Sequence, residues 1–108
     1  MNLEKKKCKP CEGGVKPLKG KELRKYIKEV DSWKAQNEHH IVKAFKFKDF
    51  KQALKFTNEV GELAEKEGHH PDILLSWGRV KIKLWTHAIA GLSENDFILA
   101  KKIDLLER

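Results

Sequence analysis

Apolar side chains recur along this chain with two different periods, which predict where its helices and strands lie. From Lys21 to Val30 they repeat every three or four positions, the spacing of a helix with one buried face. A longer helix is predicted from Asp49, which can cap its first turn, to Gly68, which can end it. Its inner side is expected to carry the apolar positions of this segment: Phe50, Ala53, Leu54, Thr57, Val60, Leu63 and Ala64.

Two short segments between these helices, Ser32 to Gln36 and Ile41 to Lys48, are predicted to be strands. The second alternates in part between apolar and lysine positions, as a strand with one buried face does. We expect the chain to turn between them at Asn37 and Glu38.

A second hairpin is predicted farther along, because Gly78-Arg79 separates two apolar-rich runs and can form a two-residue turn with the glycine at positive φ. That turn would pair Ile73 with Leu84 and sort the side chains cleanly between the two faces of the sheet. One face would be apolar, with Ile73, Leu75, Trp77, Val80, Ile82 and Leu84. The other would carry Leu74, Ser76, Lys81 and Lys83.

The segment from Ser93 to Asp96 has the form of a capping box and predicts the start of a last helix. This helix is expected to be buried through Phe97, Ala100, Ile103 and Leu106. The element order is then α-β-β-α-β-β-α. The simplest fold for it is α+β, a two-layer domain in which a four-stranded antiparallel sheet has three helices packed on one face.

Charge divides the chain unevenly. Of a net charge of +7, much lies near the N-terminus, where residues 1–21 hold seven lysines and two glutamates. We therefore expect a basic irregular arm over residues 1–20 and a single domain over residues 21–108. Lysine-rich chain ends are usually solvated, so nucleic-acid binding is not expected.

No apolar run approaches the roughly 20 residues of a membrane span, and the N-terminus lacks the apolar stretch of a secretion signal. We therefore expect a cytoplasmic protein with no membrane partner. The two cysteines, Cys8 and Cys11, form one CxxC, which is half of a four-ligand zinc site. Three readings of it stay open: an inert or structural arm, a metal site completed by histidine or a second subunit, and a redox pair.

Three of the five histidines, His69, His70 and His87, are predicted to gather at one end of the second hairpin. In the expected register His70 would face His87, although Pro71 would distort the ladder there. Strand parity would place His87 on the sheet face away from the apolar set. Imidazole can donate and accept a proton near neutral pH, which suits general acid–base catalysis. A three-histidine zinc site and unrelated surface histidines are the alternatives.

The histidines lie within segments whose spacing is specific in combination: Glu65 to Asp72 (EKEGHHPD), Trp85 to His87 (WTH) and Gly91 to Asp96 (GLSEND). Together these segments resemble the pterin-4a-carbinolamine dehydratase family, also called dimerisation cofactor of a hepatocyte homeodomain transcription factor in animals. The resemblance spans roughly Trp33 to the C-terminus. The transcriptional role belongs to the animal proteins and is not expected here.

The resemblance implies a hydro-lyase that dehydrates 4a-hydroxytetrahydrobiopterin to quinonoid dihydropterin in tetrahydrobiopterin recycling. It implies no metal or other cofactor, and a homodimer or homotetramer. By motif position His69, His87 and His70 would be catalytic, with His70 mainly a pterin contact. The positions implied for substrate binding are His70, Pro71, Glu65, Thr86 and Asp96. The alternatives are a non-catalytic interaction module of the same fold and a pterin-related role in molybdopterin metabolism.

Overall fold

The computed structural model describes residues 1–10 and 14–106, and its element order confirms the predicted α+β fold. The helices are α1 (Gly20–Ile27), α2 (Phe50–Glu67) and α3 (Glu94–Asp104). The strands are β1 (Lys34–Gln36), β2 (His40–Lys46), β3 (Asp72–Ser76) and β4 (Arg79–Leu84). Two short 3₁₀ turns, η1 (Leu3–Lys5) and η2 (His87–Ile89), complete the described part of the chain.

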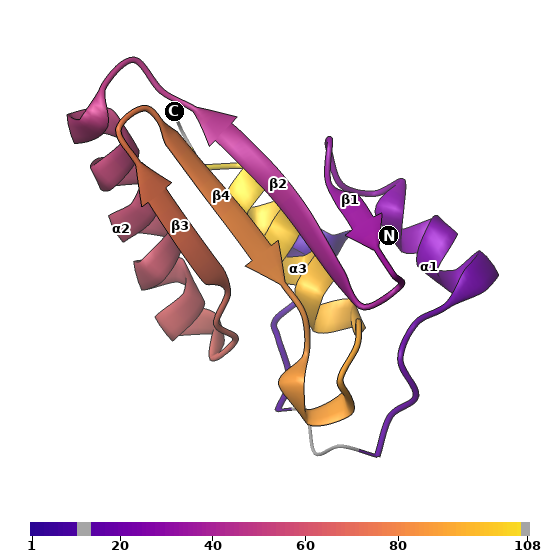
Figure 1. Cartoon of the computed structure of the whole chain (residues 1–108). Coiled ribbons are helices and arrows are strands. Elements are labelled where there is room, and N and C mark those ends of the chain that lie inside the picture. The colour runs from indigo at the N-terminus through magenta and orange to yellow at the C-terminus, as the bar shows by residue number, and fades with distance from the viewer. Residues whose placement is uncertain (11–13, 107–108) are drawn as a thin grey trace.

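The four strands form one antiparallel sheet in the order β1-β2-β4-β3. Figure 1 shows α2 and α3 behind the sheet, with α1 at the end where β1 lies. Helix α2 packs on β3 and β4, while α1 and η1 both pack against α3. Helix α3 is therefore covered on several sides, which explains why the run from Asp96 to Ala100 is buried without a break.

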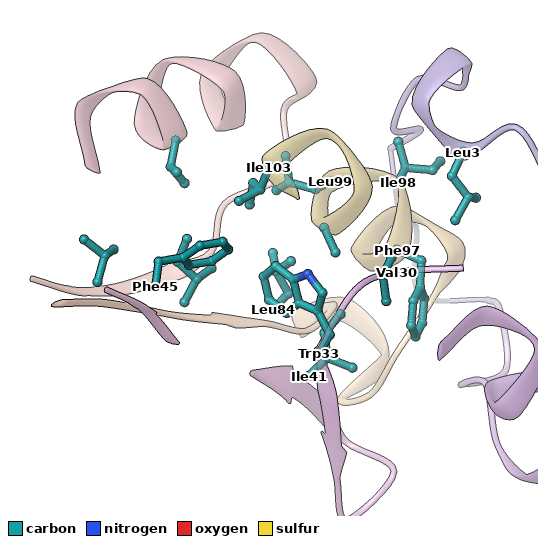
Figure 2. Close-up of a cluster of buried hydrophobic side chains, with 14 of the residues drawn as sticks. Leu3, Val30, Trp33, Ile41, Phe45, Leu84, Phe97, Ile98, Leu99 and Ile103 are labelled. Atoms are coloured by element: carbon teal, nitrogen blue, oxygen red, sulfur yellow. The ribbon is translucent and has the colours of Figure 1, made fainter. Parts of the chain in front are cut away.

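The hydrophobic core fills the space between the sheet and these helices (Figure 2). Because β4 is a central strand, its inward side chains Val80, Ile82 and Leu84 are all 0% exposed. Ile73 and Leu75 of β3 are partly buried and pack against the same cluster. The predicted apolar face is thus confirmed for β3 and β4, and Lys81 is exposed on the opposite face.

Both predicted ends of α2 are confirmed. The Asp49 side chain accepts a hydrogen bond from the Gln52 backbone N at 2.9 Å. Gly68 ends the helix with φ of 68°, a left-handed conformation that glycine adopts without steric cost. This turn sends the chain directly into His69 and His70.

The predicted inner side of α2 is partly wrong. Phe50 and Leu54 are 43% and 40% exposed. The residues of α2 that are buried are Ala53, Phe56, Val60, Ala64 and Glu67. The sequence contains two overlapping apolar stripes at helical spacing. The stripe that includes Phe56 is the one buried, because α2 packs on β3 and β4.

The predicted register of the second hairpin is also wrong. Ile73 pairs with Ile82 rather than Leu84, so the two-residue turn is Trp77-Gly78 and Trp77 is 69% exposed. Gly78 does not have a positive φ. A Cβ at Gly78 would lie 3.0 Å from the Phe47 carbonyl oxygen, so this glycine permits a close approach of two backbones.

Several element ends differ from their predicted positions. Helix α1 ends at Ile27, and Val30 is buried outside it, in the turn that leads to β1. Ser32 in this segment has a positive φ of 63°. Strand β1 begins only at Lys34 and β2 ends at Lys46. The turn at Asn37 and Glu38 is confirmed, with φ of 55° and 52°. Leu106 lies beyond the end of α3 and is half-buried.

Among the helices that the structure describes, none combines the length and apolar character needed to cross a bilayer.

Two glycines of the α2 region offer a matched test of backbone geometry. Gly68→Ala should lower the free energy of unfolding by about 1–2 kcal/mol, because alanine is strained at positive φ. Gly61→Ala, inside α2, should raise it by about 0.5–1 kcal/mol, because the helical conformation suits alanine better. An added Cβ meets nothing within 4 Å at either position, so packing does not confound the comparison. Urea unfolding measures both free energies. If both substitutions changed the free energy of unfolding in the same direction, the left-handed conformation assigned to Gly68 would be contradicted.

Candidate active site

A cavity of about 290 Å³ opens where α2 and β4 end and α3 begins, and it contains all three histidines singled out above. We call it the histidine cavity. Its lining consists of Lys9, Gly68, His69, His70, Trp85, Thr86, His87, Ala88 and Asn95. Four segments far apart in sequence therefore meet at one site.

His69 is held by a buried carboxylate. Its Nε2 donates a hydrogen bond to Asp96 Oδ1 at 2.6 Å. The His69 side chain is 12% exposed, and Asp96 is 0% exposed. A short hydrogen bond to a desolvated carboxylate is among the stronger kinds, so it restricts the ring to one orientation.

Asp96 is in turn held by the protein. Its Oδ2 accepts hydrogen bonds from Thr86 Oγ1 at 2.8 Å and from the Ser93 backbone N at 3.0 Å. The second of these bonds belongs to the predicted capping box at the start of α3, which is confirmed. Thr86 Oγ1 also lies 2.7 Å from Ser93 Oγ. Both oxygens of the buried carboxylate are thereby satisfied.

This arrangement selects one tautomer of His69. A carboxylate can only accept, so Nε2 must carry the proton that it shares with Asp96. The remaining ring nitrogen, Nδ1, is then the atom that can exchange a proton with a ligand in the histidine cavity.

His70 lies at the outer edge of the same cavity. Its Nε2 pairs with Glu65 Oε2, and both side chains are mostly exposed, at 61% and 77%. Glu65 itself does not line the histidine cavity. This carboxylate orients the imidazole of His70, but the exposure makes the pair weaker than the buried pair of His69.

His87 reaches the cavity from the turn η2 and not from a sheet face, because β4 ends at Leu84. It therefore does not face His70 across the ladder, as the predicted register required. The ring of His87 is exposed and stacks on Trp85, with centroids 3.8 Å apart and planes inclined by 22°. The Trp85 ring also lies beside the His39 ring, with their centroids 4.4 Å apart. The indole thus positions an imidazole that the backbone presents to solvent.

Trp85 carries the one buried side-chain nitrogen or oxygen atom, among the described residues, that lacks a hydrogen-bond partner. This is the indole Nε1. An unpaired buried donor costs free energy and is uncommon in a native structure.

The positions expected to bind substrate are distributed unevenly around the cavity. His70 and Thr86 line it, whereas Glu65 and Pro71 do not. Asp96 lies behind His69 and does not line the cavity. Trp85, Lys9 and Asn95 line the cavity but were not expected there. Trp85 could have been included, because it begins the WTH segment; nothing in the sequence pointed to Lys9.

Lys9 belongs to an N-terminal arm that packs against the domain. Leu3 is fully buried, and the Cys8 backbone N donates to Glu67 Oε1 at 3.0 Å. Burial and the nearby charge of Glu67 raise the pKa of the Cys8 thiol to about 12, so Cys8 is a poor thiolate nucleophile. Cys11 lies outside the described residues. Within the described ranges, no cluster of histidine, cysteine and carboxylate side chains has an arrangement that could hold a metal ion.

Comparison with known proteins identifies the family of this chain. The family model described as pterin 4 alpha carbinolamine dehydratase matches residues 16–106. A relative from Alkaliphilus metalliredigens is 58% identical over 95% of this chain and 94% of its own length. A relative from Rubrobacter xylanophilus is 50% identical over 96% of this chain and 97% of its own length. Both are named, provisionally, as pterin-4-alpha-carbinolamine dehydratases, and such enzymes are hydro-lyases.

Solved structures give the same answer for the fold. A transcriptional coactivator/pterin dehydratase from Brucella melitensis is 32% identical, with a TM-score of 0.77 over 82% of this chain and 95% of its own. A pterin dehydratase-like protein described as a RuBisCO assembly factor in the alpha-carboxysome is 28% identical, with a TM-score of 0.60. The match covers 68% of this chain and 87% of that protein's chain. From its sequence, its relatives and its fold, this chain belongs to the pterin-4-alpha-carbinolamine dehydratase family.

Proposed function

We propose that this protein dehydrates a 4a-hydroxytetrahydropterin to the quinonoid dihydropterin by histidine general acid–base catalysis. In this step the bond from C4a to the hydroxyl oxygen breaks, and the oxygen leaves as water after receiving a proton. The ring nitrogen attached to C4a loses its proton, and a carbon–nitrogen double bond forms. The reaction is redox-neutral, so the protein has only to bind the pterin and move protons.

The observation that carries this proposal is the buried Asp96 behind His69. The carboxylate fixes the proton on Nε2 and leaves Nδ1 as the ring nitrogen that can exchange a proton, as an acid–base imidazole requires. It also stabilises the imidazolium that forms when Nδ1 takes a proton.

His87 is the second proton carrier of the proposal. It lines the same cavity, is exposed, and rests on the indole of Trp85. One of the two imidazoles donates to the leaving hydroxyl while the other accepts the proton of the ring nitrogen. Each such transfer is typically worth about 10²–10⁴-fold in rate.

We assign the remaining predicted residues supporting parts. His70 contacts the pterin at the cavity edge, and Glu65 orients it. Thr86 and Ser93 hold Asp96 in place. Pro71 shapes the chain between the two histidines and β3.

The cellular setting belongs to the same proposal. We infer that the protein acts in the cytoplasm, where its product returns to the tetrahydropterin pool used by hydroxylases. We further infer a homodimer or homotetramer, because Leu74, Trp77 and Phe50 are large apolar side chains left exposed in the single chain.

A second candidate function, a non-catalytic assembly module, has one observation in its favour. The RuBisCO assembly factor shares the fold at a TM-score of 0.60. The buried His69–Asp96 pair favours the enzyme, because a binding module has no evident need for a histidine held in one tautomer at a cavity.

The dehydratase proposal is tested by stopped-flow absorbance. The 4a-hydroxytetrahydropterin is generated in the instrument, and its decay is followed with and without purified protein. We expect decay that accelerates in proportion to protein concentration and saturates with substrate. Decay equal to that in buffer at micromolar protein would refute the enzymatic proposal and favour the assembly module.

A further inference from the structure

A second hollow adjoins the histidine cavity and shares one residue with it. The hollow measures about 470 Å³ and is lined by Lys6, Lys7, Cys8, Lys9, Pro10 and Glu94. We call it the lysine hollow. Lys9 lines both spaces, which places them next to each other.

The arm that forms the lysine hollow is attached to the domain at several points. The Lys9 backbone N donates to Asn95 Oδ1 at 3.0 Å, and Asn95 Nδ2 donates back to the Lys9 carbonyl at 2.6 Å. Lys6 Nζ bonds Glu94 Oε2 at 2.9 Å. Together with the buried Leu3, these bonds fix the arm against α3, so the lysines are presented by a defined backbone and not by a free tail.

The charges that line the lysine hollow do not cancel. Lys6 is paired with Glu94, whose pKa is lowered chiefly by the hydrogen bond from Lys6 and also by that from Tyr26, although burial opposes the shift. Lys7 and Lys9 have no carboxylate within ion-pair distance among the residues that the structure describes, although Lys7 acts on Glu67 and Lys9 on Glu94 over a longer distance. With three lysines against one glutamate, the lining has a net positive charge that attracts an anion.

We propose that the lysine hollow is a subsite for an anionic group, a phosphate or a carboxylate, carried by the pterin whose ring occupies the histidine cavity. This inference rests on the proposed function. At about 290 Å³ the histidine cavity is at the small end of ligand sites, which suits a bicyclic ring but leaves a long substituent outside it. The substrate class is then a tetrahydropterin with an anionic side chain, in preference to one with a neutral side chain.

Equilibrium binding of stable oxidised pterins to the full chain tests the subsite without depending on turnover. The three probes are 6-hydroxymethylpterin, its phosphate ester and pterin-6-carboxylate, titrated calorimetrically. We expect one or both anionic probes to bind about three- to thirtyfold more tightly than the neutral one, the range for two partly exposed ion pairs. The preference should shrink as salt is raised, because exposed charges are screened. The two anionic probes distinguish phosphate from carboxylate.

The variant Lys7→Gln/Lys9→Gln should abolish this preference, so that the anionic and neutral probes bind with about equal affinity. The matched control is Lys48→Gln/Lys51→Gln, which removes the same charge at the far end of α2 and should keep the preference. Equal affinities for all three probes, no binding of any, or a preference that survives in Lys7→Gln/Lys9→Gln would overturn the subsite. Failure of the dehydratase assay alongside a lysine-dependent preference would instead overturn only the proposed reaction.

Discussion

Replacing His87 by alanine is expected to lower the turnover number for 4a-hydroxytetrahydropterin dehydration by about 10²–10⁴-fold. The free energy of unfolding should stay within about 0.5 kcal/mol of wild type, because the side chain is exposed and contacts mainly one face of Trp85. Stopped-flow decay at saturating substrate gives the rate, and urea unfolding gives the stability. A large loss of rate without loss of stability is the signature of a group that touches the reacting atoms.

His40→Ala is the matched control for this prediction. His40 is a half-buried histidine that does not line the cavity, and we expect its loss to change turnover by less than about threefold. If His69 and His87 act as one unit, the double replacement should cost far less than the product of the single effects. A wild-type rate for His87→Ala at saturating substrate would exclude His87 from the proton transfers.

The second large effect is expected from Asp96→Asn, which keeps the shape of the side chain. The Ser93 backbone N can only donate, so the amide oxygen of an asparagine must take the Oδ2 position that Ser93 bonds. The amide NH₂ then faces His69 Nε2, which has to become an acceptor, and the ring proton moves to Nδ1. We expect turnover to fall by about 10²–10³-fold, because His69 now presents the wrong nitrogen to the substrate.

Stability must be separated from catalysis in this variant. Losing a buried charged hydrogen bond should cost about 1–3 kcal/mol of unfolding free energy. Asp104→Asn is the control, because the Asp104 carboxylate is also mostly buried, with its side chain 10% exposed. It is bonded to Lys43 Nζ at 2.7 Å and to Trp33 Nε1, but does not line the cavity. It should show a similar loss of stability with near-normal turnover of the folded enzyme. Equal rates for the two variants would contradict the tautomer argument.

The elements of the fold could be predicted from the sequence because their signals are local. Asp49 and Gly68 mark the ends of α2 through contacts within a few residues. The capping box of Ser93 and Asp96 marks the start of α3 in the same way. The alternation along β3 and β4 separated core from solvent correctly, with Lys81 outside and Ile82 inside. These features depend on the chain's immediate neighbourhood, which a sequence displays directly.

The hairpin register could not be predicted from local sequence patterns. Because side chains alternate with a period of two, sliding one strand by two residues leaves every side chain on its original face. The predicted pairing of Ile73 with Leu84 and the observed pairing with Ile82 therefore sort the faces equally well. The observed register includes a contact outside the hairpin: just after β2, the Phe47 backbone N donates to the Gly78 carbonyl at 2.8 Å. The sequence of the hairpin alone does not reveal that contact.

The candidate site divides in the same way. Its histidines could be located from their motif, and the sequence by itself indicated that three imidazoles lie near one hairpin end. Only the tertiary structure decided that Asp96 binds His69 across 27 residues of sequence, and that Lys9 meets Asn95 across 86. Such contacts depend on how α3 packs between the sheet and the arm. A carboxylate that caps a helix has the same local pattern whether or not a histidine packs against it, so packing alone gave Asp96 its second role.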